Sequence, residues 1–226
     1  MALPTQTRRG FLRNSATLLA GAGVGALLRD AAMAAPNAAP NGSTGGLTFP
    51  PGFHLGVASA AYQIEGAWNA DGKGESIWDR WSHAGRGEVT GDVACDHYHR
   101  CAEDVALLKQ IGVTAYRFSI SWPRIFPNGD AAVNPQGVSF YRNLIYLLKE
   151  ARITPVVTLY HWDLPQKLED AGGWTNRETV DHFDAYARLI FREFGRDVGY
   201  WITFNEPWVT AFAGYWLGSM APGAAT

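Results

Sequence analysis

Hydrophobic and polar positions follow two different periods along the chain after about residue 50. Four short runs are rich in β-branched and aromatic residues, which is typical of buried strands. We therefore predict strands over residues 53–59, 113–120, 153–160 and 198–204. Three longer segments repeat apolar residues every three to four positions and predict helices over 96–110, 138–151 and 177–194. Gly112 and Gly195 fit helix ends, and Asn176 is the expected N-cap of the last helix.

Strands and helices alternate in this pattern, which favours a parallel sheet covered by helices and joined by right-handed crossovers. Two large folds have this order, the open doubly wound sheet and the (β/α)₈ barrel. A nucleotide-binding sheet needs a glycine-rich turn after its first strand. Ala60-Ala61-Tyr62-Gln63 stands there instead, so the doubly wound alternative is disfavoured.

Each predicted strand is followed at once by polar or aromatic residues that a connecting loop does not need for folding. The set comprises Gln63 and Glu65, Trp122 and Arg124, His161, Trp162 and Asp163, and finally Asn205 and Glu206. In a barrel of parallel strands all of these ends meet at the face where active sites form. We therefore predict an α/β fold, with residues 47–226 supplying about the first four β/α units of a (β/α)₈ TIM barrel.

The first 46 residues have a different character and are predicted to lie outside this fold. Residues 1–34 read as a signal peptide, in which Arg8-Arg9 precedes a short apolar stretch. The paired arginines are typical of bacterial twin-arginine export. Residues 35–46 are rich in Ala, Asn, Pro and Gly and predict a flexible linker. We expect export to the periplasm or beyond, with no membrane attachment after cleavage; an uncleaved anchor or a wrongly assigned start are the alternatives.

Composition narrows the functional classes. Hydrophobic residues make up 47% and charged residues 18%, a globular balance, and the net charge of −2 with no basic patch argues against nucleic-acid binding. Cys95 and Cys101 are six positions apart in one predicted helix, about 9 Å, which is too far for a disulfide. We expect two free, mostly buried thiols, and no metal or organic cofactor.

Glu206 lies in Thr203-Phe204-Asn205-Glu206-Pro207, directly after the fourth predicted strand. A carboxyl group at a barrel rim can protonate a glycosidic oxygen while a neighbouring amide holds a sugar hydroxyl. By itself, the tripeptide Asn205-Glu206-Pro207 is more typical of a turn with a solvated carboxylate. The other strand ends decide between these interpretations.

Four motifs together resemble family 1 of the glycoside hydrolases: ASAAYQIEGAW, YRFSISWPRI, YHWDLP and TFNEP, in that order along the chain. The resemblance covers nearly all of residues 49–218. It implies a (β/α)₈ barrel and a retaining β-glycosidase with two glutamates, β-glucosidases being prominent members. The implied substrate is a β-linked glucoside or oligosaccharide.

The resemblance also assigns roles to single residues. Glu206 matches the acid/base, Asn205 the amide that binds the 2-hydroxyl, and Gln63 and His161 the groups that bind hydroxyls on the far side of the sugar. Arg117 matches an arginine beside the nucleophile, the alternative being an ordinary buried ion pair. Trp162 either lines the pocket or only packs. Glu65 and Asp163 are expected to hold loops by hydrogen bonds.

The family's nucleophile lies in a Glu-Asn-Gly motif after a later strand, and the 226 residues contain no such motif. We therefore expect the chain to be inactive alone. Three hypotheses remain open: part of an exported β-glycosidase, a non-catalytic sugar-binding remnant, and a half-barrel that needs a complementing C-terminal chain or associates with itself.

Overall fold

The computed structural model describes residues 48–87 and 89–224, and the predicted leader and linker lie outside them. Every described element belongs to the compact unit that begins at Pro51. In chain order the elements are β1 (Gly56–Ala58), α3 (Ala61–Ile64), α4 (Ile77–His83), α5 (His97–Gln110), β2 (Ala115–Ser119), α6 (Trp122–Ile125), α7 (Pro135–Glu150), β3 (Thr154–Tyr160), α8 (Gln166–Asp170), η1 (Gly173–Thr175), α9 (Glu178–Phe194), β4 (Tyr200–Phe204), α10 (Pro207–Val209) and the π-helix η2 (Thr210–Trp216).

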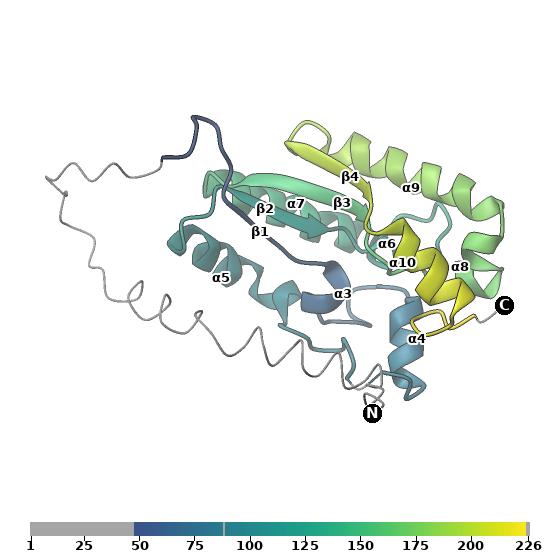
Figure 1. The fold of residues 1–226 in the computed structure, drawn as a ribbon. Helices are drawn as coiled ribbons and strands as arrows, with labels where there is room; N and C mark the ends of the chain where they lie inside the picture. Colours follow the sequence, from purple (N-terminus) through teal and green to yellow (C-terminus); the bar gives the residue numbers. More distant parts are fainter. Residues whose placement is uncertain (1–47, 88, 225–226) are drawn as a thin grey trace, which may run out of the picture. The chain divides into compact units, whose positions relative to one another are not determined.

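The four strands form one parallel sheet in the order β1-β2-β3-β4, as Figure 1 shows. Each strand pairs with the next one along the chain, and a helix-containing crossover separates them. The register places Arg117 opposite Ala58 and Val156, and Thr158 opposite Ile202. The predicted parallel β/α arrangement is therefore confirmed, and all four strands end at the same edge of the sheet.

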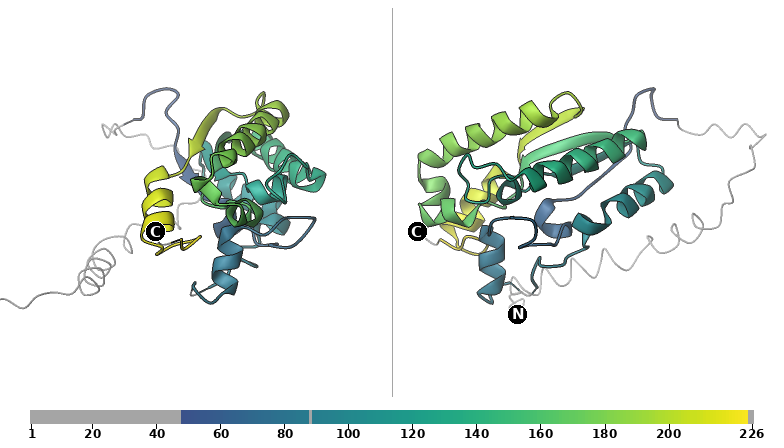
Figure 2. Two further views of the ribbon diagram at one scale, coloured as in Figure 1. Left: turned by 90° about the vertical axis from the view of Figure 1, so that its right-hand side faces the viewer. Right: turned by 180° about the vertical axis from the view of Figure 1, so that it is seen from behind.

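The long helices α5, α7 and α9 cover one face of the sheet, which is the nearer face in the rear view of Figure 2. Strand side chains of that face, such as Phe118 and Val157, share a buried core with Leu144 of α7 and Ile190 of α9. The helical period of three to four residues in α9 buries Tyr186, Leu189, Ile190 and Phe194 on one side. The strands are thus fixed from behind, and their other face remains available for a site.

The sheet curves strongly toward that other face. Neighbouring strands lie about 4.8 Å apart, so β1 and β4 would be about 14 Å apart in a flat sheet. Yet the rings of His54, just before β1, and Tyr200, at the start of β4, have centroids only 6.1 Å apart in an edge-on contact. The amino ends of the two outer strands therefore bend toward each other, as they do in a barrel.

The first predicted strand and the predicted burial of Cys95 differ from the structure. Strand 53–59 shrinks to the exposed Gly56–Ala58, because β1 lies at the sheet edge and pairs only with β2. Cys95 is exposed rather than buried and precedes α5, since the left-handed backbone of Asp96 (φ 56°) starts the helix only at His97. Cys101 is buried as predicted, and neither thiol forms a disulfide.

The start of the last long helix also differs by one residue. Arg177 is the N-cap of α9, yet the Asn176 side chain accepts a hydrogen bond from the Glu178 amide at 3.0 Å. The predicted capping side chain is therefore present, one position earlier than the cap itself. Within residues 48–87 and 89–224, no helix has the length and apolar character needed to cross a bilayer.

Candidate active site at the carboxyl ends of the strands

The structure places the six predicted site residues in or just after the strands, on the open face. Gln63 lies in α3 after β1, Arg117 within β2, His161 and Trp162 after β3, and Asn205 and Glu206 after β4. Parallel strand order alone accounts for this gathering, because the loop after each strand emerges at the same edge. The side chains then separate into two linked groups.

The first group is a chain of hydrogen bonds that runs from β2 to Glu206. Arg117 donates from Nη2 to Asn205 Oδ1 at 2.7 Å and from Nε to Thr158 Oγ1 at 3.0 Å. Asn205 in turn donates from Nδ2 to Glu206 Oε2 at 3.2 Å. Because its oxygen faces the guanidinium, the amide must present its nitrogen to the carboxylate. Among the described residues Arg117 donates to an amide and a hydroxyl oxygen, and its alternative as a buried ion pair stays a prediction.

Glu206 has a left-handed backbone, with φ 46° and ψ 63°. This conformation costs a residue with a Cβ about 1–2 kcal/mol and is common at functional sites. Neighbouring bonds hold it: the Asn205 amide donates to the Tyr160 carbonyl at 2.9 Å, and the Val209 amide donates to the Glu206 carbonyl at 2.9 Å. The carboxyl group is exposed on the open face.

The second group begins at His161 and Trp162. Trp162 donates from Nε1 to the Asn205 carbonyl at 3.0 Å, which joins this group to the first. Its ring stacks on Trp78 of α4, with centroids 6.3 Å apart and planes 24° apart. Trp162 therefore both packs and lines a pocket, and the two interpretations of this residue are not exclusive.

His161 is half-buried, and its Nδ1 has no hydrogen-bond partner among the described residues. Burial, and secondarily the positive charge of Arg117, lower the pKa of His161 to about 4. The imidazole is consequently neutral near pH 7, with one donor and one acceptor nitrogen. A neutral ring of this kind can hold a sugar hydroxyl without competing for its proton.

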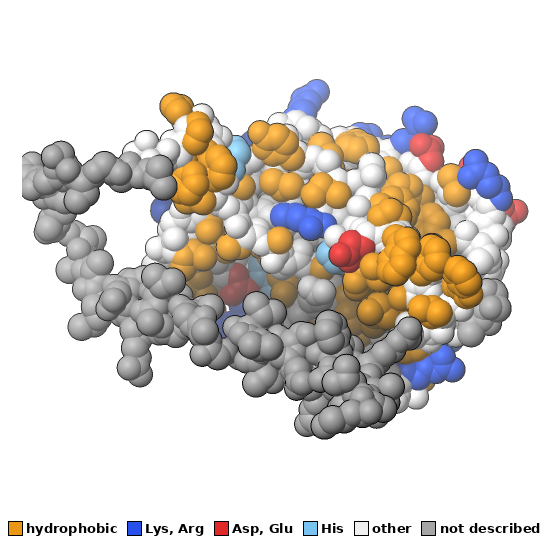
Figure 3. All heavy atoms as spheres, in the orientation of Figure 1, with side chains coloured by type: hydrophobic (Ala, Val, Ile, Leu, Met, Phe, Trp, Pro, Cys, Tyr) orange, Lys and Arg blue, Asp and Glu red, His pale blue; other side chains and the backbone are white. Residues whose placement is uncertain are grey.

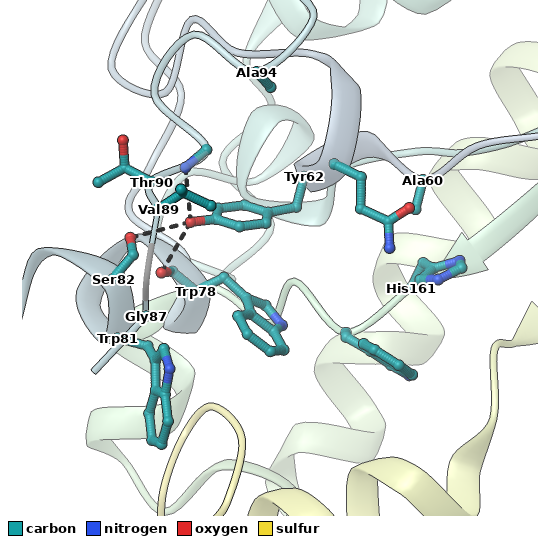
Figure 4. Close-up of a pocket in the computed structure, with 13 residues that line it drawn as sticks. Ala60, Tyr62, Trp78, Trp81, Ser82, Gly87, Val89, Thr90, Ala94 and His161 are labelled. Atoms are coloured by element: carbon teal, nitrogen blue, oxygen red, sulfur yellow. Dashed lines mark hydrogen bonds between the residues drawn. The ribbon is translucent and has the colours of Figure 1, made fainter. Parts of the chain in front are cut away.

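A cavity of about 480 Å³ lies beside this second group (Figure 4). Several of its walls are aromatic rings, and its lining comprises Ala60, Tyr62, Gln63, Trp78, Trp81, Ser82, Gly87, Val89, Thr90, Gly91, Ala94, His161 and Trp162. Gln63, His161 and Trp162 were predicted for the site, whereas Arg117, Asn205 and Glu206 do not line this cavity. The two groups of predicted site residues are therefore connected through Trp162, but they do not all line one cavity.

Sequence reasoning missed the aromatic wall that α4 and Tyr62 contribute. The Tyr62 hydroxyl contacts the Trp78 carbonyl and Ser82 Oγ, both at 3.1 Å, and so fixes α3 against α4 (Figure 4). The signal for α4 was present: Ser76 and Asp79 form a capping box, with Asp79 donating its amide to Ser76 Oγ at 3.1 Å. Ser-x-x-Asp before an apolar run marks a helix start.

Two buried carboxyl groups lie behind the site. Glu65 accepts from Arg124 Nε at 2.9 Å and from the Tyr141 hydroxyl at 2.5 Å, which confirms its predicted structural role. Asp163 is 1% exposed, and its oxygens form no hydrogen bond of good geometry within the described residues. Burial raises the pKa of Asp163 to about 8, and Ser121 acts on this carboxyl group as a hydrogen-bonding neighbour that opposes the rise of its pKa. The prediction that Asp163 holds its loop by hydrogen bonds therefore stays a prediction.

Beyond Glu206 the surface is apolar. Figure 3 shows hydrophobic side chains gathered over α10 and the segment that follows it. Trp208 and Phe212 stack with centroids 4.8 Å apart, and Phe212 lies 5.0 Å from Trp216. The exposed carboxyl group of Glu206 thus stands between a polar hydrogen-bonded chain and an aromatic surface.

Comparison with known proteins identifies the family. The model of glycosyl hydrolase family 1 matches residues 46–226, and the chain belongs to this family. The family fold is a (β/α)₈ barrel, to which the four parallel strands and their helices correspond as the first units. The predicted resemblance and the predicted fold class are confirmed.

Individual relatives are similar over a defined part of their length. The chain is 58% identical over 181 residues to β-glucosidase A of Acetivibrio thermocellus, which covers 78% of this chain and 40% of the relative. It is 53% identical over 213 residues to thermostable β-glucosidase B of Thermobispora bispora, covering 92% and 44%. A solved β-glucosidase from Thermotoga maritima, in complex with a substituted glucoimidazole, matches with TM-score 0.77 and 54% identity, covering 79% and 41%. The chain therefore spans less than half of the length of these relatives.

Proposed function

We propose that the chain supplies the acid/base part of a retaining β-glucosidase. The observation that carries this proposal is the hydrogen-bonded series Arg117–Asn205–Glu206, which runs from a central strand to an exposed carboxyl group. It is supported by the names of the relatives, which are β-glucosidases, and by the substituted glucoimidazole that the solved Thermotoga maritima enzyme binds. The substrate class is a β-linked glucoside or oligosaccharide.

In the proposed reaction, a carboxylate that is not among these 226 residues attacks the anomeric carbon while Glu206 protonates the departing glycosidic oxygen. Glu206 then removes a proton from water, which displaces the enzyme carboxylate and releases the sugar with its configuration retained. The two carboxyl groups of such a pair lie about 5–5.5 Å apart. Asn205 holds the 2-hydroxyl, and Arg117 stands beside the attacking carboxylate, keeps it ionised and orients Asn205.

The remaining site residues bind the sugar in this proposal. Gln63 and His161 contact hydroxyls on the side opposite Glu206, and Trp162 offers a flat face to the sugar C–H groups. The neutral state of His161 suits this role, because a charged imidazole could only donate hydrogen bonds.

The role of Glu206 is tested in the chain completed by the C-terminal half of a family member. Glu206→Ala should reduce kcat for an activated aryl β-glucoside by about 10²–10⁴-fold. Added azide should restore turnover and yield the β-glucosyl azide, since a small anion can then attack the glycosyl-enzyme without a base. If azide has no effect, or gives the α-azide, Glu206 is not the acid/base of a retaining reaction.

A second candidate function is sugar binding without catalysis. The cavity that Gln63, His161 and Trp162 line favours it, because these groups are all within the chain. Titration of the chain alone with glucose or cellobiose, followed by NMR, tests this candidate. Saturable shifts that disappear in Gln63→Ala would support binding by this cavity, and the absence of shifts at about 100 mM sugar, where even a Kd near 1 mM would saturate the site, would exclude a useful affinity.

We further propose that a complementing chain or a second copy covers the open face of the sheet. β1 and β4 each pair with one neighbour, and Val57 and Tyr200 on these edges are exposed. Free sheet edges promote association with other chains. Light scattering of residues 35–226 should show dimers or larger species, whereas a monomer with a sharp, reversible melt would contradict this partner proposal.

Export remains a proposal that rests on residues 1–34. Fusion of these residues to a reporter that folds before transport should give export that requires the Arg8-Arg9 pair. Replacing both arginines by lysine should retain the reporter in the cytoplasm, and continued export of that variant would contradict the twin-arginine route.

A further inference from the structure

A second connection, remote from Asn205, joins the loops that follow β3 and β4. The Tyr215 hydroxyl, from η2, donates a hydrogen bond to Glu169 Oε2 of α8 and accepts one from the Trp174 amide of η1 at 3.1 Å. Tyr215 is 8% exposed and Glu169 is half-buried, so water competes weakly for this contact. Glu169 and Trp174 follow His161 and Trp162 along the chain, and Tyr215 follows Glu206.

The backbone around this contact is shaped to admit it. Gly173 has φ 53°, and a Cβ at this position would overlap both Glu169 Oε2 and the Tyr215 hydroxyl. On the other side, η2 is a π-helix in which the Leu217 amide donates to the Phe212 carbonyl at 2.7 Å. The wider turn of a π-helix changes the direction of the side chains that follow it, and such turns are frequent at functional sites.

The same cluster contacts the segment before Glu206. The ring of Trp174 packs against Phe204, the last residue of β4, with centroids 5.1 Å apart. Trp174 therefore contacts the chain two residues before Glu206 and binds Tyr215 nine residues after it. The left-handed turn at Glu206 lies between two anchored points, and its strained backbone needs such support.

We propose that Tyr215 and Glu169 are positioning residues for Glu206. Their contact anchors η2 to the loop after β3 and thereby fixes the direction in which the Glu206 carboxyl group points toward the glycosidic oxygen. This inference rests on the proposed acid/base role of Glu206. It assigns to Tyr215 and Glu169 no contact with the substrate.

The test uses the chain completed by the C-terminal half of a family member and compares two substrates. The glycosidic bond of 2,4-dinitrophenyl β-glucoside breaks without proton donation, whereas that of an alkyl β-glucoside needs the acid. Tyr215→Phe should lower kcat/KM about 10- to 100-fold for the alkyl glucoside. For the dinitrophenyl glucoside the same variant should change kcat/KM less than about threefold, because its leaving group needs no acid.

Tyr186→Phe is the matched control, because it also removes a buried phenol hydroxyl, which donates to the Ile120 and Leu159 carbonyls at 3.2 and 2.9 Å. It should lower the melting temperature without separating the two substrates. If Tyr215→Phe does not fold, Glu169→Ala removes the same contact from the other side.

Equal losses for both substrates in Tyr215→Phe and in Glu169→Ala would overturn the positioning role. A completed enzyme that hydrolyses neither substrate before any substitution would instead contradict the proposed function. The two failures are therefore distinguishable in one set of assays.

Discussion

At the scale of single residues, a small number of hydrogen bonds and ring contacts fixes the orientation of the site side chains. Asn205 has one orientation because Arg117 holds its oxygen and Glu206 accepts from its nitrogen. Trp162 is fixed by the Asn205 carbonyl and by the ring of Trp78. These contacts explain why residues from three strands meet although they are far apart in sequence.

Asp163 yields a pH prediction at this scale. The pKa of its buried carboxyl group is about 8 in the folded chain and close to 4 when exposed, so folding favours its protonated form. The stability from this proton is complete below about pH 4 and declines as the pH rises toward 8. We predict that Asp163→Asn, which cannot ionise, gains in melting temperature relative to the unaltered chain between about pH 6.5 and 8.

His161 requires this choice of pH range. Its pKa is lowered to about 4, so the stability that it contributes is present above about pH 6.5 and is lost as the pH falls toward 4. Above about pH 6.5, a change with pH in the melting-temperature difference therefore reports the ionisation of Asp163. Asp184→Asn is the control, because Asp184 lies in an exposed ion pair with Arg188. A constant difference between Asp163→Asn and the unaltered chain would show that Asp163 is ionised throughout.

The sequence predicted the placement of site residues that follow a strand. It did not predict surroundings that depend on the packing of distant elements. Gln63, His161 and Glu206 directly follow strands, so their gathering at one edge was predictable. The burial of Asp163 and the groups that face it depend on which side chains other elements bring near it. Local sequence carries no record of that environment.

At the scale of elements, the helices and strands are joined by a few buried polar contacts. One of them joins α6 to the end of α3: Arg124 and Glu65 have side chains that are 1% and 5% exposed. Removing one partner leaves the other charge buried and unpaired. We predict that Arg124→Met lowers the free energy of unfolding by about 3–5 kcal/mol in urea denaturation.

Arg188→Met provides the comparison for that measurement. Arg188 and Asp184 pair on the surface of α9 with side chains that are 77% and 59% exposed. Such pairs contribute about 0–1 kcal/mol. Equal effects of Arg188→Met and Arg124→Met would mean that the Arg124–Glu65 pair is well solvated.

Gly173 gives a second prediction for elements, because η1 joins two loops of the site. Gly173→Ala adds a methyl group at positive φ and places it on Glu169 and Tyr215. Gly112→Ala shares the positive φ, 79°, but its new methyl group meets nothing within 4 Å. We expect Gly112→Ala to cost about 1 kcal/mol and Gly173→Ala clearly more, as measured by urea denaturation. Equal costs would show that the Glu169–Tyr215 contact gives way easily.

The sequence predicted the type and order of the long elements, since their periodicity extends over several turns or a full strand. It missed the short helices α3, α4, α6 and α8, which are too brief for a period and are fixed by caps and neighbours. It overestimated the length of β1, because a hydrophobic run does not indicate whether its strand lies at a sheet edge.

At the scale of the whole chain, one polar and one aromatic region share the open face of a curved four-stranded sheet. The helices bury the other face of the central strands β2 and β3, while Glu206 and the edge strands stay exposed. This chain covers 40–44% of the length of two relatives that are named β-glucosidases. The proposed mechanism therefore requires a nucleophilic carboxylate on a second segment that faces Glu206.

The most direct test adds the C-terminal half of a family β-glucosidase to the purified chain and follows an aryl β-glucoside by proton NMR. The chain alone should release no sugar, and the mixture should release glucose first as the β anomer. Glu206→Gln should abolish this gain for substrates with poor leaving groups. First release of the α anomer, or hydrolysis that does not change in Glu206→Gln, would contradict the proposal that Glu206 is the acid/base of a retaining enzyme.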